Sequence, residues 1–294
     1  MKSSGPAVAR YTSKNELVAL IRQVIPTVVT TGFHLVPISG LSSENWRICT
    51  SQGDWLARPQ LLAGLQIGTD RQREFVVLRQ MAAHGLSPRP LCWQKGWLII
   101  EWLSGHIATQ ETFIDAVNDG SLAVSLARLH QQPGYGFLLD LKTRFARHWQ
   151  LMDPGRRSPA LLKRHQMFQH RRLPEGGIFA PLHLDIHAGN LLQKQDQWWF
   201  IDWEYAADGD IALEVAGLFR ANDLNEASQQ RFLDAYCHQW PGLWPDVLGH
   251  RVYQWLPWVD FMILMWYEVR WQQTHQKSFL QAADAMRLRL GITP

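Results

Sequence analysis

The sequence predicts an α+β fold of two lobes, an N-terminal lobe built on an antiparallel sheet and a larger, mainly helical C-terminal lobe. Three observations support it. Short β-rich runs separated by turn residues fill residues 28–58. Helical periodicity dominates the sequence after Gly105, and a chain of 294 residues is long enough for two lobes. We place the boundary at the change of pattern near Leu103, which gives lobes of residues 1–102 and 103–294.

In the N-terminal lobe a helix is expected first, because Ser13 and Glu16 form a capping-box pattern and apolar residues follow at helical spacing. The runs FHLVPIS, NWRICTS and DWLAR then predict an antiparallel meander. A second helix is expected within residues 69–84, which Gly85 closes. The segment QKGWLIIEWLSGH predicts a turn and a strand that stops at Gly105.

The C-terminal lobe is expected to be helical except for one β interlude between Phe179 and Asp202. There, PLHLDIH and WWFIDW are apolar runs joined by the turn-rich loop AGNLLQKQDQ. Two strands inside a helical lobe indicate a functional site. From Ile211 onward the pattern is helical again, and Pro257 should kink or restart the long helix that contains it.

Composition narrows the class of protein and its setting. The 29 Lys and Arg against 26 Asp and Glu give a net charge of +3, too small to indicate a polyanionic partner. Cys49, Cys92 and Cys237 are odd in number and far apart, which favours neither a disulfide framework nor a metal site. No apolar run matches a signal peptide or a membrane span. We therefore expect a cytoplasmic protein with no membrane partner, and the oligomeric state is left open.

The chemistry is concentrated in the β interlude. His183, Asp185 and Asn190 stand in HLDIHAGNLL, and Asp202 follows in FIDWEYA. Asp185 and Asn190 are separated as the catalytic Asp and the metal-binding Asn are in kinase-type catalytic loops. Phosphoryl transfer needs one carboxylate to deprotonate the attacking hydroxyl and oxygen ligands for Mg²⁺. Asp185 suits the first role, and Asn190 and Asp202 suit the second.

The motif HxDxHxGN followed by IDWEYA resembles the aminoglycoside phosphotransferase and choline kinase superfamily, whose small-molecule kinases share a two-lobed protein-kinase-like fold. Within that superfamily, LHLDIHAGNLL, IDWEYAADGDIALEVA and the Trp-rich C-terminal segment most resemble the bacterial thiamine kinases. The resemblance spans essentially the whole chain. It implies an enzyme that uses ATP and Mg²⁺ to phosphorylate the hydroxyethyl group of thiamine, giving thiamine monophosphate.

The same resemblance implies a set of nucleotide-binding residues. SGLSSEN resembles the loop that covers the phosphates through its backbone N–H groups. The following strand should carry a Lys for the phosphates but has Arg58, which grips phosphate differently from Lys. An acid on the next helix should pair with this base, and backbone groups of the inter-lobe hinge should meet the adenine edge. The implied residues are Gly40, Ser42, Arg58, Glu74, Glu101 and Leu103.

The acceptor of this fold would lie between the catalytic loop and the helices after it, where acids stand among Trp residues. Such a mixture suits a flat organic cation such as thiamine, although core packing is the commoner role for any single Trp. Asp260 and Glu268 are eight positions apart, so both carboxylates should lean toward one side of their helix. Asp210 is also a candidate helix N-cap. The expected acceptor residues are Trp203, Glu204, Asp210, Trp258, Asp260, Trp266 and Glu268.

Three alternatives stay open at this point. The acceptor could be choline or another amino alcohol, or an aminoglycoside, on the same fold. A remoter alternative is a non-catalytic kinase-like binding protein that uses the basic stretch from Lys142 to Arg172, with nine Lys or Arg and only Asp153 as an acid. Apolar residues interleave with these charges, so we favour amphipathic helices there and regard a nucleic-acid partner as unlikely. We expect His130, His183 and His187 to be structural rather than general bases.

Overall fold

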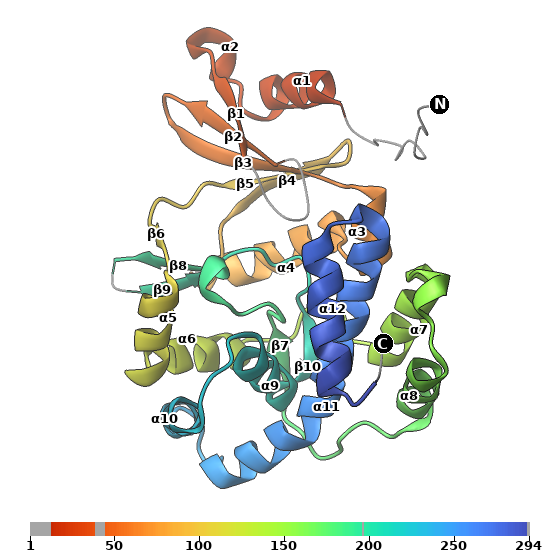
Figure 1. Ribbon diagram of the computed structural model, residues 1–294. Coiled ribbons are helices and arrows are strands. Elements are labelled where there is room, and N and C mark those ends of the chain that lie inside the picture. The colour runs from red at the N-terminus through yellow and green to blue at the C-terminus, as the bar shows by residue number, and fades with distance from the viewer. Residues whose placement is uncertain (1–12, 39–44, 196, 293–294) are drawn as a thin grey trace. The chain divides into compact units, whose positions relative to one another are not determined.

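The computed structural model describes residues 13–38, 45–195 and 197–292 (Figure 1). The chain divides into two compact units. The sheet unit comprises Met1–Gly105 together with Ile201–Tyr205, and the helical unit comprises His106–Phe200 and Ala206–Pro294. The first unit therefore ends three residues beyond the expected limit at 102. The short segment Ile201–Tyr205, which contains Asp202, returns to the sheet unit although it lies far along the sequence.

The sheet unit is built on a five-stranded sheet of order β1-β2-β3-β5-β4, in which every neighbouring pair is antiparallel. The expected meander and both expected helices are present. The structure adds two short helices that the sequence patterns did not predict. The elements are α1 (Lys14–Val24), α2 (Val28–Thr31), β1 (His34–Ile38), β2 (Asn45–Thr50), β3 (Gly53–Pro59), α3 (Leu62–Ile67), α4 (Arg71–Ala82), β4 (Pro90–Gln94) and β5 (Trp97–Glu101).

Helix α1 begins at the predicted capping box, in which the Ser13 hydroxyl accepts from the Glu16 N–H and the Glu16 carboxylate accepts from the Ser13 N–H. Its apolar face, including Leu17 and Leu20, packs into the core formed with the sheet. Helix α4 starts at Arg71, two residues after the beginning of the expected range, because Asp70 is its N-cap and accepts from two backbone N–H groups of the first turn.

The helical unit holds eight helices among the described residues and two small sheets. Its helices are α5 (Gln110–Asn118), α6 (Ser121–His130), α7 (Leu141–Leu151), α8 (Pro159–His170), α9 (Ile211–Ala221), α10 (Glu226–Cys237), α11 (Pro245–Thr274) and α12 (Lys277–Arg289). Its strands are β6 (His106–Ile107), β7 (Phe179–Leu182), β8 (Leu191–Lys194), β9 (Gln197–Phe200) and β10 (Ala207–Asp210). Short 3₁₀ turns span Pro154–Arg156 and Ala188–Asn190.

The β interlude is richer than the sequence predicted. Part of the loop between the two expected strands forms β8, because its apolar Leu191 and Leu192 pair with Phe200 and Trp199 of β9. Strand β7 pairs with β10 instead, antiparallel. The HLDIHAGN segment therefore leaves one small sheet at Leu182 and enters another at Leu191, so both of its ends are held by strand pairing.

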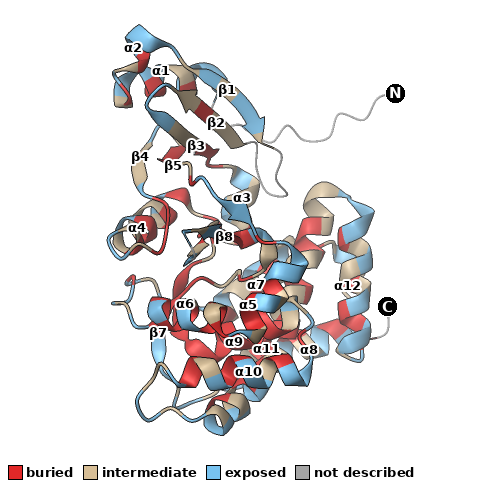
Figure 2. Cartoon of the chain, turned by 90° about the vertical axis from the view of Figure 1, so that its left-hand side faces the viewer, coloured by how far each residue is buried: buried red, intermediate tan, exposed pale blue. Residues whose placement is uncertain are grey.

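Helix α11 continues through Pro257 as one helix, so the helix does not restart there. A proline removes the hydrogen bond to the carbonyl four residues earlier, which here belongs to Tyr253. That residue is 73% exposed, so water can satisfy its carbonyl oxygen. One turn further, the helix is deeply buried, and residues of α9 and α11 form much of the interior in Figure 2.

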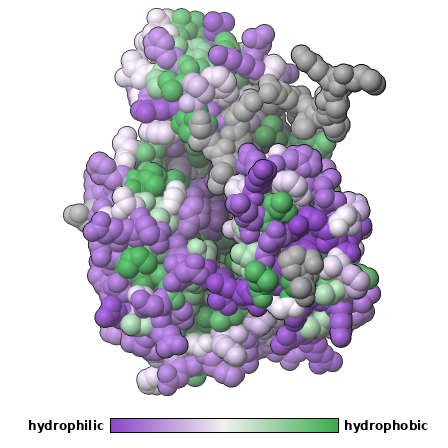
Figure 3. Space-filling view, in the orientation of Figure 1, coloured by the Kyte–Doolittle hydropathy of each residue, from purple (hydrophilic) through white to green (hydrophobic). Residues whose placement is uncertain are grey.

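The basic stretch forms α7 and α8, whose buried faces carry Phe145, Leu161 and Phe168. This is the amphipathic arrangement that the sequence favoured. On the face shown in Figure 3, hydrophobic side chains are scattered among hydrophilic ones. Within the described part of the chain, no helix combines the length and apolar character that crossing a membrane requires.

Candidate active site

The loop after β7 holds Asp185 and Asn190 as a hydrogen-bonded pair in the helical unit. The Asn190 Nδ2 donates to the Asp185 backbone carbonyl oxygen at 2.9 Å and to the Asp185 Oδ2 at 2.8 Å. The side chain of Asp185 is 34% exposed and so can reach a ligand, whereas Asn190 is buried. The spacing of five residues thus closes a compact turn that fixes the orientation of the carboxylate.

The backbone just before Asp185 is strained and is held by hydrogen bonds to a buried carboxylate. Leu184 has φ 66°, in the left-handed region that a bulky side chain rarely adopts. The N–H of Leu184 donates to one oxygen of Glu214, and the N–H of His183 donates to the other at 3.0 Å. Glu214 belongs to α9 and is buried. This carboxylate therefore fixes the backbone of the two residues that precede Asp185.

Glu214 is itself held by two further buried side chains. The His130 Nε2 lies 2.7 Å from the Glu214 Oε2, and the His130 Nδ1 lies 2.6 Å from the Tyr236 hydroxyl. We call Tyr236, His130 and Glu214 the buried relay. His130 is thus structural, as expected. His187 is also a loop residue, whose Nδ1 accepts from the Gly189 N–H at 3.1 Å.

The relay keeps a carboxylate charged in the interior. Burial raises the pKa of Glu214. The hydrogen bond and charge of His130, together with the Leu184 amide, lower it by more, so the pKa of Glu214 lies below its ordinary value. Burial and the charge of Glu214 raise the pKa of Tyr236 well above its ordinary value, so this phenol stays neutral. Sequence reasoning missed Glu214 and Tyr236, although an acid inside the apolar stretch IALEVA was an available signal for the first.

The sheet unit holds a second cluster, which joins two guanidinium groups to three carboxylates. Arg58, on β3, pairs with Glu74 and Asp202 and lies 3.1 Å from the Glu204 Oε2. Arg71 pairs with Glu74 and lies 3.0 Å from the same Glu204 oxygen. We call these five residues the arginine cluster. The expected pairing of Arg58 with Glu74 is present, and Arg71 is a partner that sequence reasoning missed.

Burial sets the electrostatics of the arginine cluster. Burial lowers the pKa of Arg58, but Asp202, Glu74 and Glu204 raise it more, so its charge is locked in place. Burial and the nearby Asp202 raise the pKa of Glu204 against the opposing effect of Arg71 and Arg58. Asp202 is the most accessible acid of the cluster, with 33% of its side chain exposed, and it has φ 65°. The cluster therefore presents Asp202 while it encloses the other charges.

Most of the expected acceptor residues have side chains that are buried in protein contacts. Trp258 is fully buried against Phe145 and Phe168, Trp203 is 1% exposed, and Glu204 belongs to the arginine cluster. Asp210 caps α9 and pairs with Arg251. All four side chains are buried in protein contacts, and their role toward an acceptor stays a prediction.

The two acids of α11 do not lean toward one site either. Asp260 pairs with Arg220 of α9. Glu268 is fully buried between Arg156, at 2.7 Å, and Arg287 of α12. These carboxylates therefore neutralise different guanidinium groups, and their role toward an acceptor stays a prediction. Trp266 is half-buried and packs edge-on against Phe279.

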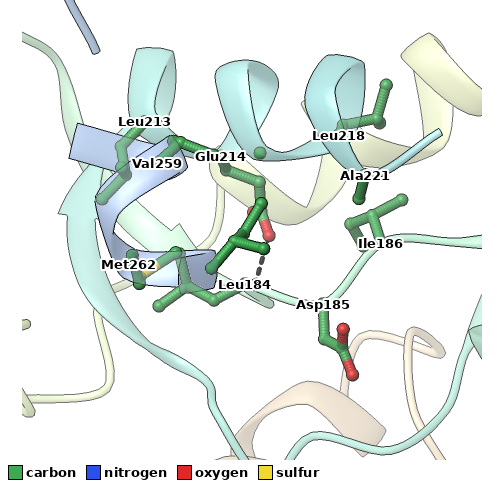
Figure 4. A pocket seen from close by; sticks show the side chains of 11 residues that line it. Leu184, Asp185, Ile186, Leu213, Glu214, Leu218, Ala221, Val259 and Met262 are labelled. Atoms are coloured by element: carbon green, nitrogen blue, oxygen red, sulfur yellow. Dashed lines mark hydrogen bonds between the residues drawn. The ribbon is translucent and has the colours of Figure 1, made fainter. Parts of the chain in front are cut away.

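A pocket opens beside Asp185 within the helical unit (Figure 4). It lies between the loop after β7 and helices α9 and α11, which contact each other. None of its described lining residues is aromatic, and its only acids are Asp185 and Glu214. In Figure 4, Met262 and Val259 lie on one side and Leu218 and Ala221 on the other. The lining residues are Leu184, Asp185, Ile186, Leu213, Glu214, Gly217, Leu218, Ala221, Val259, Met262 and Ile263.

Of the remaining residues expected to bind the nucleotide, the structure describes Glu101 and Leu103. Gly40 and Ser42 lie outside the described residues. The N–H of Glu101 already donates to the Arg89 carbonyl oxygen at 2.8 Å. Any hydrogen bond from the Glu101 backbone to an adenine would therefore have to use its carbonyl group. The side chain of Leu103 is buried.

Comparison with known proteins places this arrangement in a family. The phosphotransferase enzyme family matches residues 34–250. Thiamine kinase of Escherichia coli O17:K52:H18 (strain UMN026) is 34% identical over 212 residues, which cover 72% of this chain and 74% of that protein. Thiamine kinase of Salmonella heidelberg (strain SL476) is 35% identical over the same shares of each chain.

Solved structures show the same fold at low sequence identity. Choline kinase LicA from Streptococcus pneumoniae has a TM-score of 0.76 and 15% identity over 94% of this chain and 99% of its own. A structure of LicA in complex with AMP has a TM-score of 0.72 and 15% identity over 93% and 97%. The predicted two-lobed α+β fold is confirmed. On the extent of the family match and the identity to curated relatives, this chain belongs to the phosphotransferase enzyme family, together with those thiamine kinases.

Proposed function

We propose that this phosphotransferase transfers the γ-phosphoryl group of ATP to the hydroxyethyl group of thiamine, giving thiamine monophosphate and ADP. The observation that carries the proposal is the fixed Asp185–Asn190 pair in a chain about one-third identical to thiamine kinases. The AMP complex of a protein with this fold supports an adenine nucleotide as the donor.

Asp185 acts as the general base in this proposal. Its exposed carboxylate accepts the proton of the acceptor hydroxyl while the oxygen attacks the γ-phosphorus. The Asn190 amide holds the carboxylate in one orientation, and Glu214 holds the backbone that carries it. Because phosphoryl transfer depends chiefly on positioning and electrostatics, these hydrogen bonds contribute to rate by fixing the base.

Mg²⁺ fits the donor atoms that the chain offers. Asn190 commits its amide nitrogen to Asp185, so its Oδ1 is the atom suited to a cation. Asp202 offers a part-exposed carboxylate, and such hard oxygen donors are the ligands that Mg²⁺ prefers. When bound, Mg²⁺ would neutralise phosphate charge and orient the nucleotide. Arg58, held by Glu74 and Glu204, would keep Asp202 in place and stand where the family has a phosphate-binding lysine.

The nucleotide is proposed to be bound by the N-terminal lobe and the acceptor by the C-terminal lobe. For the nucleotide we retain Arg58, Glu74, Gly40 and Ser42, the carbonyl group of Glu101 and the backbone of Leu103. For the acceptor we propose the pocket beside Asp185, whose apolar walls suit a ring, while the acceptor residues expected from the sequence stay predictions. The carboxylates of Asp185 and Glu214 give the pocket the negative charge that a thiazolium cation requires.

A cytoplasmic location belongs to the same proposal. The three cysteines are all free thiols, and two of them are buried. Free cysteines are typical of proteins in a reducing compartment.

The proposal is tested by measuring ADP release with thiamine, choline and an aminoglycoside as separate acceptors. We expect ADP release that depends on thiamine, with thiamine monophosphate formed in equal amount. Release with choline alone would move the function to an amino-alcohol kinase. Absence of ADP release with every acceptor, together with salt-sensitive binding of RNA, would favour a non-catalytic binding protein instead.

A further inference from the structure

Helix α9 contains a glycine for which the fold gives no structural reason. Gly217 stands inside the helix Ile211–Ala221, where glycine is less stable than alanine. It is not among the glycines with positive φ, so no special backbone conformation requires it. A Cβ added at Gly217 would meet no described heavy atom within 4 Å. By contrast, a Cβ at Gly209 would lie 2.9 Å from Leu182, so packing explains that glycine.

The open space at Gly217 is the pocket beside Asp185. Leu213, Gly217 and Ala221 are four residues apart and so share one face of α9, and all three line the pocket. Gly217 is half-buried although its neighbours Ala216 and Leu218 are fully buried. The missing side chain therefore enlarges the pocket directly, instead of relieving a contact elsewhere.

The wall opposite Gly217 suits a planar ring. Met262 and Ile263 of α11 line the pocket and are both half-buried. A thioether makes favourable contacts with aromatic rings and adapts its shape to them. A glycine on the facing helix offers a flat peptide surface with no projecting side chain. The same pocket is lined by Asp185, whose carboxylate would deprotonate a hydroxyl.

We propose that Gly217 determines acceptor specificity by leaving room between α9 and α11 for the ring of a ring-bearing cationic alcohol. The inference rests on the proposed function, since it concerns the acceptor of the same reaction. In this arrangement the ring lies against the Gly217 backbone and the Met262 side chain, and the hydroxyl arm extends toward Asp185. A side chain at position 217 would occupy the ring's place without disturbing the protein.

The test uses Gly217→Ala and Gly217→Leu in the full-length protein, with Gly249→Ala on α11 as the matched helix glycine outside the pocket lining. Steady-state kinetics are measured with thiamine and with the smaller 5-(2-hydroxyethyl)-4-methylthiazole. We expect kcat/KM for thiamine to fall about 10-fold in Gly217→Ala and about 100-fold in Gly217→Leu, as for a few carbon atoms misplaced in an apolar pocket. KM for ATP should not change, and the smaller thiazole should lose a similar factor, because it carries the same ring and hydroxyethyl arm.

Thermal unfolding separates this effect from damage to the fold, because alanine favours the helix and the unfolding midpoint of Gly217→Ala should equal or exceed that of the wild type. Unchanged kcat/KM for thiamine in Gly217→Leu would overturn the inference while leaving the proposed function intact. A wild-type protein that does not phosphorylate thiamine would instead contradict the proposed function. Equal losses in Gly217→Ala and Gly249→Ala would also overturn the inference, because the effect would then be a general one on helices.

Discussion

The two units hold their candidate catalytic acids by different physical means. In the sheet unit, Asp202 is held by the guanidinium of Arg58, within a cluster of buried full charges. In the helical unit, Asp185 is held by the Asn190 amide, and Glu214 fixes the preceding backbone. Positive φ occurs in both places, at Asp202 itself and at Leu184. A carboxylate suited to bind a cation is thus oriented by charge, and one suited to accept a proton is oriented by neutral donors.

The largest effect should come from the base itself. Asp185→Asn keeps the size of the side chain but removes its ability to accept a proton, so kcat should fall by about 10²- to 10⁴-fold. Nucleotide affinity, measured by isothermal titration calorimetry, should stay close to that of the wild type. Asp234→Asn, on the exposed face of α10, is the control and should keep full activity. Wild-type turnover in Asp185→Asn would remove Asp185 from the mechanism.

Arg58→Met tests the charged side of the comparison. The change leaves the three carboxylates of the cluster to the single guanidinium of Arg71, so the free energy of unfolding in urea should fall by about 3–5 kcal/mol. Arg58→Lys should fall between that variant and the wild type, because one ammonium group cannot replace the planar fork of a guanidinium. Arg89→Met removes an ion pair whose arginine is 77% exposed, and should cost less than about 1 kcal/mol. Similar losses at both positions would contradict the account of the arginine cluster.

Glu214→Gln tests the hydrogen-bonded side through its pH dependence. The folded pKa of Glu214 lies below its ordinary value of 4.5, so its contribution to stability is present above that pH and is lost as the pH falls through the folded pKa. Urea unfolding from pH 7 to pH 3 should therefore show a shallower loss of stability in Glu214→Gln than in the wild type. The kcat of the variant should fall more than its KM for ATP changes, since the Leu184 backbone is no longer held by a charge. Parallel pH profiles would show that Glu214 is not ionised in the folded protein.

The smallest effect is expected at the far end of the buried relay. Tyr236→Phe removes the hydroxyl that bonds to His130, which should cost about 1 kcal/mol of stability and a modest part of kcat. Tyr135→Phe is a matched control, because the hydroxyl of Tyr135 is buried and has no hydrogen-bond partner among the described residues. Thermal unfolding and kcat of the two variants decide the matter. A greater loss in Tyr135→Phe would contradict the role of the relay.

The local patterns of the sequence predicted most of the fold. The capping box at Ser13, the β-rich runs and the helical periodicity depend on residues close in the chain, so they could be recognised without a structure. Short elements such as α3 (Leu62–Ile67) and β8 (Leu191–Lys194) escaped because so few residues carry too little periodicity. The continuity of α11 past Pro257 depends on the exposure of Tyr253, which only tertiary structure reveals.

The candidate site divides in the same way. Asp185 and Asn190 are five residues apart, and that spacing is itself the signal. The buried relay joins His130 to Glu214 and Tyr236, which lie 84 and 106 positions further along the chain. No local sequence pattern reports such distant contacts. Helix α11 is apolar around much of its circumference, so its sequence did not distinguish the buried Trp258 and Glu268 from the pocket-lining Met262.

The most direct test of the account is mass spectrometry of the product formed from ATP, Mg²⁺ and thiamine by the wild type and by Asp185→Asn. The account predicts thiamine monophosphate, formed mole for mole with ADP, in the wild-type reaction. In the same reaction time Asp185→Asn should form at least about 10²-fold less thiamine monophosphate than the wild type. ADP formed without thiamine monophosphate, or equal product from both proteins, would contradict it.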